Sequence, residues 1–172
     1  MNIWDAIQYR RSIRKYDDKP VSDEDLQRIL QAAMMAPSAM NAQPWHFLII
    51  RDRKVLAEIA ANNPNAEMAK EAPLAILVAA DLKLEQAPGF WPQDCSAAVQ
   101  NLLLAVHALG LGAVWTGIYP QEKSIAGYRR LFQLPEHIVP HSLIPIGHPA
   151  ESPETEDRYR EDRIHHGQWP QG

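Results

Sequence analysis

The sequence predicts an α+β fold, in which helices flank a central, mainly antiparallel or mixed sheet, within one domain of 172 residues. Apolar runs of strand length recur along the chain, at 46–51, 74–81, 113–118 and 141–146. Helical patterns lie between these runs in an irregular order rather than in strict alternation. No repeat, low-complexity tract or linker divides residues 1–172, and this length is sufficient for a single hydrophobic core.

The N-terminal part predicts two helices separated by a loop. Apolar residues at helical spacing indicate a helix over roughly 2–10, and a loop follows over 11–20. Ser22 and Asp25 then form the Ser-x-x-acid pattern of a helix start. This second helix ends before Pro37, because the residue before a proline is pushed out of helical geometry.

The middle of the chain predicts two strands with a helix between them. The segment "HFLIIR" (46–51) indicates a buried strand, and 54–63 a short helix. The segment "LAILVAAD" (74–81) is nearly all apolar, as expected for a strand that is covered on both faces. The proline- and glycine-containing segment 82–93 is expected to be a loop that carries Phe90 and Trp91.

The helix predicted over 94–108 is apolar on more than one side, which indicates burial in the centre of the molecule or at a subunit contact. A strand (113–118), a helix (123–132) and a final strand (141–146) are predicted after it. Residues 147–172 have few aliphatic side chains and cannot form a core alone. This C-terminal extension is expected either to be disordered or, as Trp169 favours, to pack on another surface such as a partner subunit.

Composition excludes several classes of function. The net charge of −4 disfavours a broad nucleic-acid or anionic-membrane surface. No stretch approaches the ~20 apolar residues of a membrane span, and the N-terminus lacks a signal-peptide pattern. The lone Cys95 excludes an internal disulfide and is expected to be structural, and no histidine or cysteine motif predicts a metal site. We therefore expect a cytoplasmic protein without nucleic-acid or membrane partners.

The segment "YRRSIRKY" (9–16) concentrates positive charge in an acidic chain. Arg10, Arg11, Arg14 and Lys15 surround Ser12. Guanidinium groups bind oxyanions with two parallel hydrogen bonds, and a serine adds a hydroxyl donor, so the segment suits a phosphate. A solvated basic turn, or a contact with an acidic patch of a partner, fits the charge equally well.

Two further segments carry weaker signals. The predicted loop "APSAMNAQPWHF" (36–47) presents short polar side chains that can meet the edge of a flat heterocycle, although such residues are also common in turns. In "GLGAVWTGI" (110–118), Gly117 permits close approach of a ligand to the backbone. A strand bulge explains this glycine equally well.

Together and in this order, these segments resemble the nitroreductase family of FMN flavoproteins. The resemblance spans almost the whole chain and rests on "RRSIRKY", "PSAMNAQPW", "DCSAAVQNLLLAVHALGLGAVWTG" and "IGHPAE" followed by Arg158. Each motif is weak alone, whereas the ordered set is specific. The resemblance implies an intertwined homodimer with FMN at the subunit interface and the helix 94–108 in the dimer core.

The resemblance also implies the residues that bind the cofactor. Arg10, Ser12 and Arg14, together with Arg11, would hold the FMN phosphate, and Arg158 would add a further contact. Residues of the loop would reach the flavin from the other subunit, and residues of the third strand would line the isoalloxazine near N5 and O4. The first group comprises Pro37, Ser38 and Asn41, and the second comprises Trp115, Thr116 and Gly117.

The chemistry implied by the resemblance is hydride transfer from NADH or NADPH to flavin N5, followed by reduction of a nitroaromatic or quinone acceptor in ping-pong order. No protein acid or base is required, so no catalytic residue is assigned. Lys70 and Asn65 lie in a plausible region to stabilise the reduced flavin. Three aromatic residues would either form the substrate-side wall of the site or pack at the dimer interface, namely Phe90, Trp91 and Tyr119.

Two alternatives remain at the level of the sequence. In the first, the chain is a flavin-binding sensor or an electron-delivery protein with little turnover. In the second, it is a small anion-binding module without flavin. The second alternative leaves Gly117 and the "PSAMN" loop unexplained.

Overall fold

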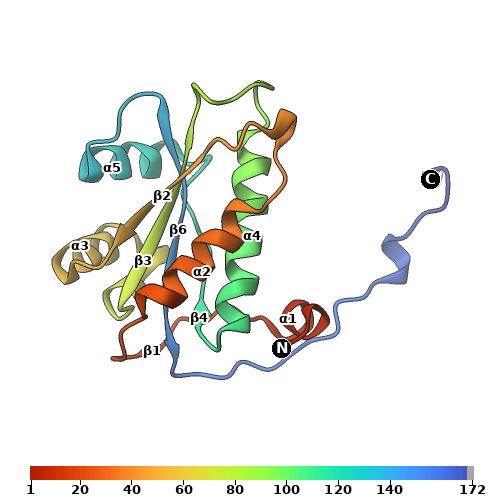
Figure 1. Cartoon of the computed structure of the whole chain (residues 1–172), viewed down its shortest axis with the longest axis horizontal. Coiled ribbons are helices and arrows are strands. Elements are labelled where there is room, and N and C mark those ends of the chain that lie inside the picture. The colour runs from red at the N-terminus through yellow and green to blue at the C-terminus, as the bar shows by residue number, and fades with distance from the viewer. Residues whose placement is uncertain (170–172) are drawn as a thin grey trace.

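A central antiparallel sheet separates two layers of helices in the computed structural model, which describes residues 1–169 (Figure 1). The four strands along its main path follow the order β1-β6-β3-β2, and two short strands, β4 and β5, also pair with β6. All of these named strands pair in antiparallel fashion, while a parallel bridge joins Ser12 to Ala113. The strand bounds are β1 Tyr16–Asp17, β2 Trp45–Ile50, β3 Leu74–Asp81, β4 Gly112–Ala113, β5 Thr116–Gly117 and β6 Ile138–Pro149.

The helices cover both faces of this sheet. Two of them, α2 and α4, pack on one face, while α3 and α5 pack on the other, and α1 lies near the C-terminal end of α4 (Figure 1). Three short 3₁₀ segments, η1 to η3, complete the described elements. Their bounds are α1 Ile3–Tyr9, α2 Asp23–Met34, η1 Ala39–Asn41, α3 Arg53–Asn62, η2 Pro64–Lys70, α4 Trp91–Ala108, α5 Glu122–Phe132 and η3 Glu161–Arg163.

The alternation of side chains along β3 explains why this strand is apolar on both faces. Ile76 and Val78 contribute to the cluster beneath α2 and α4, whereas Ala75 and Leu77 contribute to the cluster beneath α3, η2 and α5. Complete burial of a side chain such as Leu77 stabilises the fold by about 1.5–3 kcal/mol relative to its exposure. The predicted α+β class and its antiparallel sheet are thus confirmed.

The predicted start of the second helix is also confirmed. The Ser22 hydroxyl accepts a hydrogen bond of 3.0 Å from the backbone N–H of Asp25, which satisfies one of the otherwise unpaired donors of the first turn of α2.

Four element boundaries differ from the sequence-based expectation. Helix α4 begins at Trp91, inside the predicted loop, because Pro92 occupies the first helical turn, where its missing N–H costs nothing. The predicted strand 113–118 is interrupted at Val114 and Trp115, opposite Pro145 of β6, which has no N–H to donate to the ladder. Strand β6 extends beyond 141–146, and β1 lies within the predicted loop 11–20.

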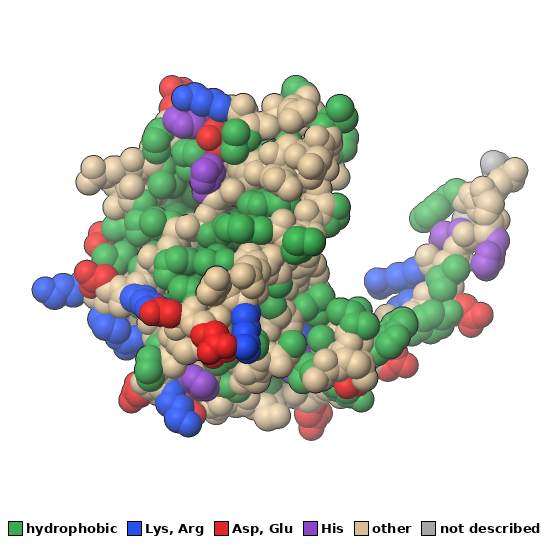
Figure 2. Space-filling model, viewed as in Figure 1, with side chains coloured by type: hydrophobic (Ala, Val, Ile, Leu, Met, Phe, Trp, Pro, Cys, Tyr) green, Lys and Arg blue, Asp and Glu red, His purple; other side chains and the backbone are tan. Residues whose placement is uncertain are grey.

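The C-terminal segment first follows the basic N-terminal segment and then leaves the body. The Ala150 N–H donates to the Lys15 carbonyl at 2.9 Å, and the Glu151 carboxylate accepts from the backbone N–H groups of Arg14 and Lys15 at 2.5 and 3.2 Å. After Glu154, whose carbonyl accepts from Arg11, the chain extends away from the helices and the sheet (Figures 1 and 2), and Trp169 is 79% exposed. Residues 170–172, the end of the predicted extension, lie outside the described residues.

Within residues 1–169, no helix combines the length and the apolar character needed to cross a lipid bilayer.

Candidate functional site

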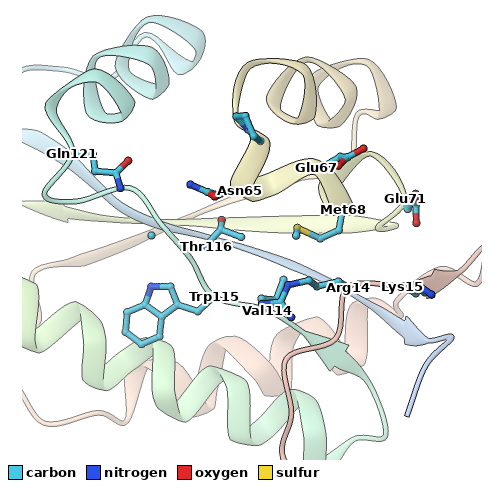
Figure 3. Close-up of a pocket in the computed structure, with 12 residues that line it drawn as sticks. Arg14, Lys15, Asn65, Glu67, Met68, Glu71, Val114, Trp115, Thr116 and Gln121 are labelled. Carbon is cyan, nitrogen blue, oxygen red and sulfur yellow. The ribbon is translucent and has the colours of Figure 1, made fainter. Parts of the chain in front are cut away.

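A pocket of about 720 Å³ opens between the basic N-terminal segment, η2 and the interrupted edge strand β4–β5 (Figure 3). Of the predicted site residues, Arg14, Trp115, Thr116 and Gly117 line it together. In Figure 3 the Arg14 side chain extends toward Val114 and Trp115, whereas Lys15 extends the opposite way. The remaining lining residues are Lys15, Pro64, Asn65, Glu67, Met68, Glu71, Val114 and Gln121.

Close backbone packing holds the basic segment against β4. The Ile13 N–H donates to the Ala113 carbonyl at 2.9 Å. A Cβ atom at Gly112 would lie 2.7 Å from the Ile13 Cγ2 atom, so this close approach requires glycine at position 112. The buried Tyr16 hydroxyl lies 2.6 Å from the Ile13 carbonyl and fixes the other side of the segment. Arg14 is therefore held at the pocket by its neighbours on both sides.

Gly117 differs from Gly112, because nothing in the described chain requires a glycine there. Its φ lies outside the left-handed region, and an added Cβ would have no heavy atom of the described residues within 4 Å. The preceding residue, Thr116, is buried, and its hydroxyl donates to the Leu143 carbonyl at 2.8 Å. The backbone at Gly117 is thus held in place and open to the pocket, which fits close approach by a flat ligand.

Positive charges gather beside the C-terminal end of α4. Burial lowers the pKa of the Arg10 guanidinium, and the positive charges of Arg11 and Arg158 lower it further. The pKa of His107, in the last turn of α4, is lowered by burial and then by Arg10 and Arg11. Within residues 1–169, neither Arg10 nor Arg14 has an ion-pair partner. A bound anion would relieve the repulsion in this cluster.

Two residues predicted to bind the phosphate, Arg11 and Arg158, have polar partners within the chain. The Arg11 Nη1 atom donates to the carbonyls of Gln8 and Arg10, both at 2.8 Å, and its Nε atom donates to the Glu154 carbonyl at 3.1 Å. Arg11 therefore joins the end of α1 to the C-terminal segment. Arg158 lies 3.8 Å from a carboxylate oxygen of Glu156, and because both side chains are exposed this pair contributes little stability.

Ser12 lies in the bridge to Ala113 and is half-buried beside this cluster.

The predicted loop residues Pro37, Ser38 and Asn41 lie at the opposite end of α4. The Ala39 N–H donates to the Asp94 Oδ1 atom at 2.9 Å, in the first turn of this helix. The 18 residues of α4 span about 27 Å. Within one chain, these three residues therefore do not line the pocket that contains Arg14.

The loop itself has an unusual backbone. Met40, Asn41 and Gln43 have φ values of 53°, 54° and 48°, in the left-handed region that residues other than glycine rarely occupy. The Ser38 hydroxyl accepts from the Gln43 N–H at 2.9 Å, and Asp94 holds Ala39. These contacts fix a conformation that costs free energy by itself.

Several lining residues were not identified by the sequence reasoning. Of the two residues expected to stabilise the reduced flavin, Asn65 lines the pocket and Lys70 does not; the Lys70 ammonium lies 2.9 Å from a carboxylate oxygen of Glu67. Lys15, which is not among the residues expected to contact the FMN phosphate, lines the pocket, as do Met68 and Glu71. The only available sequence signal was their position: Lys15 adjoins Arg14, and the other residues follow Pro64.

An aromatic group lies behind Trp115. The ring centroids of Trp91 and Tyr119 are 4.5 Å apart, and the ring centroids of His141 and Trp115 are 5.6 Å apart. Trp91 is buried in the core cluster, whereas Phe90 is exposed.

Burial lowers the pKa of His141 to about 4, so this imidazole is neutral near pH 7. Its ring nitrogens lie 3.3 Å from the Ser96 hydroxyl and 3.1 Å from the Ser142 hydroxyl. These two hydroxyls satisfy its polar atoms inside the core.

Cys95 is buried among the core residues of α4, and burial raises its thiol pKa to about 12. This fits the predicted structural role, since the thiolate is the nucleophilic form. Among residues 1–169, no group of three or more His, Cys, Asp or Glu side chains is placed to hold a metal ion.

The comparisons with known proteins agree with this geometry. The model of the nitroreductase family matches residues 7–62 and 57–148. A protein of Methanothermobacter thermautotrophicus, provisionally named NADH dehydrogenase/NAD(P)H nitroreductase, is 54% identical over 169 residues, which are 98% of this chain and 88% of that protein.

Two solved structures share the fold. A provisionally named nitroreductase of Desulfovibrio desulfuricans in complex with FMN is 35% identical, with a TM-score of 0.85 over 99% of both chains. The NADPH:FMN oxidoreductase of Vibrio harveyi in complex with NAD⁺ is 26% identical, with a TM-score of 0.87, and the match covers 99% of this chain and 79% of that one. On the family match, the sequence identity and the shared fold together, this chain belongs to the nitroreductase family.

Proposed function

We propose that this protein is an FMN-dependent oxidoreductase that accepts a hydride from NADH or NADPH and reduces a nitroaromatic or quinone acceptor in ping-pong order. One observation carries the proposal above all. The open backbone at Gly117 faces a pocket of about 720 Å³ that Arg14 also lines, and within residues 1–169 neither Arg14 nor the nearby Arg10 of the basic segment has an ion-pair partner. A flat ring system with a phosphate fits both features. Relatives in the family are named as FMN reductases and FMN-dependent nitroreductases, which supports the same assignment.

The basic segment would bind the phosphate end of the cofactor. Arg10, Ser12 and Arg14 would supply donors, and Arg158 would add a cation from the C-terminal segment. Arg11 would keep these groups in place through its three carbonyl contacts while adding positive charge. Charge-assisted hydrogen bonds of this kind are about twice as strong as neutral ones.

The edge strand would hold the isoalloxazine. Trp115, Thr116 and Gly117 line the pocket, with Asn65 on the opposite wall. When bound, FMN supplies the hydride-accepting N5 atom, so the protein needs no acid or base of its own. These residues would orient the ring and exclude water from one face.

We further propose that two copies of the chain complete the site. Ile3, Trp4 and Ile7 of α1 are 61%, 70% and 50% exposed, and Figure 2 shows hydrophobic side chains gathered where the tail departs. A second copy would cover this surface and α4, and its loop would bring Pro37, Ser38 and Asn41 to the flavin. The described part of the extension that follows β6, residues 150–169, would pack on that copy.

Absorption spectroscopy of the purified protein tests the cofactor. The protein should be yellow and should bleach near 450 nm under anaerobic conditions when NADH or NADPH is added. After removal of the nicotinamide, a quinone or nitroaromatic should restore the colour. Double-reciprocal plots of the steady-state rate against nicotinamide concentration, at several acceptor concentrations, should be parallel. A yellow protein that neither nicotinamide bleaches would favour the sensor or electron-delivery role. Colourless protein that cannot be reconstituted with FMN would refute the proposal.

Sedimentation equilibrium combined with FMN titration tests the shared site. The FMN affinity should weaken on dilution as dimers dissociate, because binding to the dimer alone links the two equilibria. A monomer that binds FMN with undiminished affinity would contradict the shared site.

A further inference from the structure

A second groove, of about 650 Å³, lies between α3 and α5 and adjoins the first pocket. Pro64, Asn65 and Gln121 line both cavities. In Figure 3, Asn65 and Gln121 lie between the first pocket and the two helices, so they form the shared rim. A molecule that extends past these residues leaves one cavity and enters the other.

The groove presents two cations to this path. Lys123 and Arg130, both on α5, line it and are exposed, and neither has an ion-pair partner among the described residues. Glu58 is the single acidic residue of the lining. The groove therefore carries an excess of one positive charge, which suits a ligand with phosphate groups.

The floor of the groove suits a flat aromatic group. Tyr128 is buried, and its hydroxyl lies 3.4 Å from the Asn63 amide nitrogen, which ties α5 to the end of α3. Ile59 and Leu131 supply apolar surface. Gly127 has φ outside the left-handed region, and an added Cβ there would meet no heavy atom of the described chain within 4 Å. The helix surface is thus flat and open at this position.

We propose that this groove binds the adenosine and phosphate portion of the nicotinamide dinucleotide. Lys123 and Arg130 contact the phosphate on the adenosine side of its pyrophosphate, and the surface around Ile59 and Gly127 receives the adenine. The inference rests on the proposed function, because the groove serves this role only when the nicotinamide ring lies in the first pocket. The pyrophosphate then crosses the rim at Asn65 and Gln121.

Anaerobic stopped-flow reduction of the bound flavin tests this assignment with three donors. NADH and NADPH contain the adenosine half, whereas reduced nicotinamide mononucleotide lacks it. The double variant Lys123→Ala/Arg130→Ala should lower the second-order rate constant for both dinucleotides by about tenfold or more, the scale of one charge-assisted hydrogen bond. Reduction by the mononucleotide and the FMN affinity should stay unchanged. Lys54→Ala, which removes a cation from α3 outside the groove, should leave all three rates unchanged.

Calorimetric titration with ADP-ribose provides the second measurement, because this molecule reports on the groove without any redox step. It should bind the wild-type holoprotein and bind the double variant at least tenfold more weakly. Equal losses with the mononucleotide and the dinucleotides would overturn the inference, as would unchanged dinucleotide rates. If no nicotinamide reduces the flavin, the proposed function fails. The titration then decides separately on the groove, and absence of ADP-ribose binding to the wild type refutes it.

Discussion

Replacement of Arg10 by alanine tests the phosphate role of the basic cluster most directly. This guanidinium is half-buried, and its neighbours Arg11 and Arg158 repel it rather than neutralise it. Its removal should therefore leave the flavin-free protein as stable as before, or slightly more stable. The substitution should reduce stability only when a ligand that carries a phosphate is bound.

The expected magnitude follows from the hydrogen bond that the guanidinium would donate to the phosphate. One hydrogen bond to a charged group contributes about 1.5–3 kcal/mol, so the FMN dissociation constant should rise about 10- to 150-fold. At an FMN concentration of roughly 100 times the wild-type Kd, bound ligand stabilises the fold by about 2.7 kcal/mol. A variant with about 30-fold weaker binding would retain only about 0.9 kcal/mol of that stabilisation at the same concentration.

Fluorescence titration with FMN and with riboflavin separates the phosphate from the ring. Arg10→Ala should weaken FMN binding and leave the weaker riboflavin binding unchanged, because riboflavin has no phosphate. Lys83→Ala, an exposed cation in the loop after β3, provides the matched control and should alter neither affinity. If Arg10→Ala weakens both ligands equally, or neither, Arg10 does not bind the phosphate.

Three further changes have defined outcomes. Gly117→Ala should change the unfolding free energy by less than about 1 kcal/mol yet weaken FMN binding. Gly112→Ala should destabilise the fold by about 1–3 kcal/mol, because its added Cβ would lie 2.7 Å from Ile13. Urea unfolding and FMN titration measure both effects, and a larger loss of stability in Gly117→Ala than in Gly112→Ala would contradict the site. Asp94→Ala should cost about 1–3 kcal/mol because the Ala39 N–H loses its acceptor, while Asp94→Asn keeps an acceptor and should cost less; equal costs in urea would refute this role. The folded-state pKa of His141 is about 4 and its ordinary value is 6.5, so the neutral imidazole's contribution to the unfolding free energy is fully present above pH 6.5. That contribution is lost as the pH falls toward 4, by up to about 3 kcal/mol. His141→Gln should flatten the dependence of the urea midpoint on pH, and an unchanged dependence would exclude the assignment.

Local signals in the sequence were sufficient for most elements. The continuous apolar run 74–81 predicted a strand covered on both faces, and its side chains do alternate between two core clusters. The capping pattern at Ser22 placed the start of α2 because its hydrogen bond spans only three residues. The break at Val114 could not be predicted locally, since its cause, Pro145, lies about thirty residues away and becomes a neighbour only in the folded sheet.

The same distinction applies to the candidate site. Arg14 and Gly117 were predicted from short motifs, and the fold brings them to one pocket. Met68 and Glu71 were not predicted, because the side of η2 that faces the pocket is decided by packing against the sheet. Arg11 illustrates a further limit: its charge was evident in the sequence, whereas its hydrogen bonds to three carbonyls depend on where the C-terminal segment runs.

The positions of the two predicted halves of the site lead to a conclusion that neither motif could give alone. The arginine cluster lies beside the C-terminal end of α4, and the loop with Ser38 and Asn41 lies at its N-terminal end, about 27 Å away along 18 residues. A single copy cannot bring both to one flavin without rebuilding α4, whose buried side chains form much of the core. If both motifs serve the cofactor, they must therefore come from different copies. The apolar, partly uncovered surface of α4 and α1 and the departing C-terminal segment are then parts of the same arrangement, in which association completes the binding site.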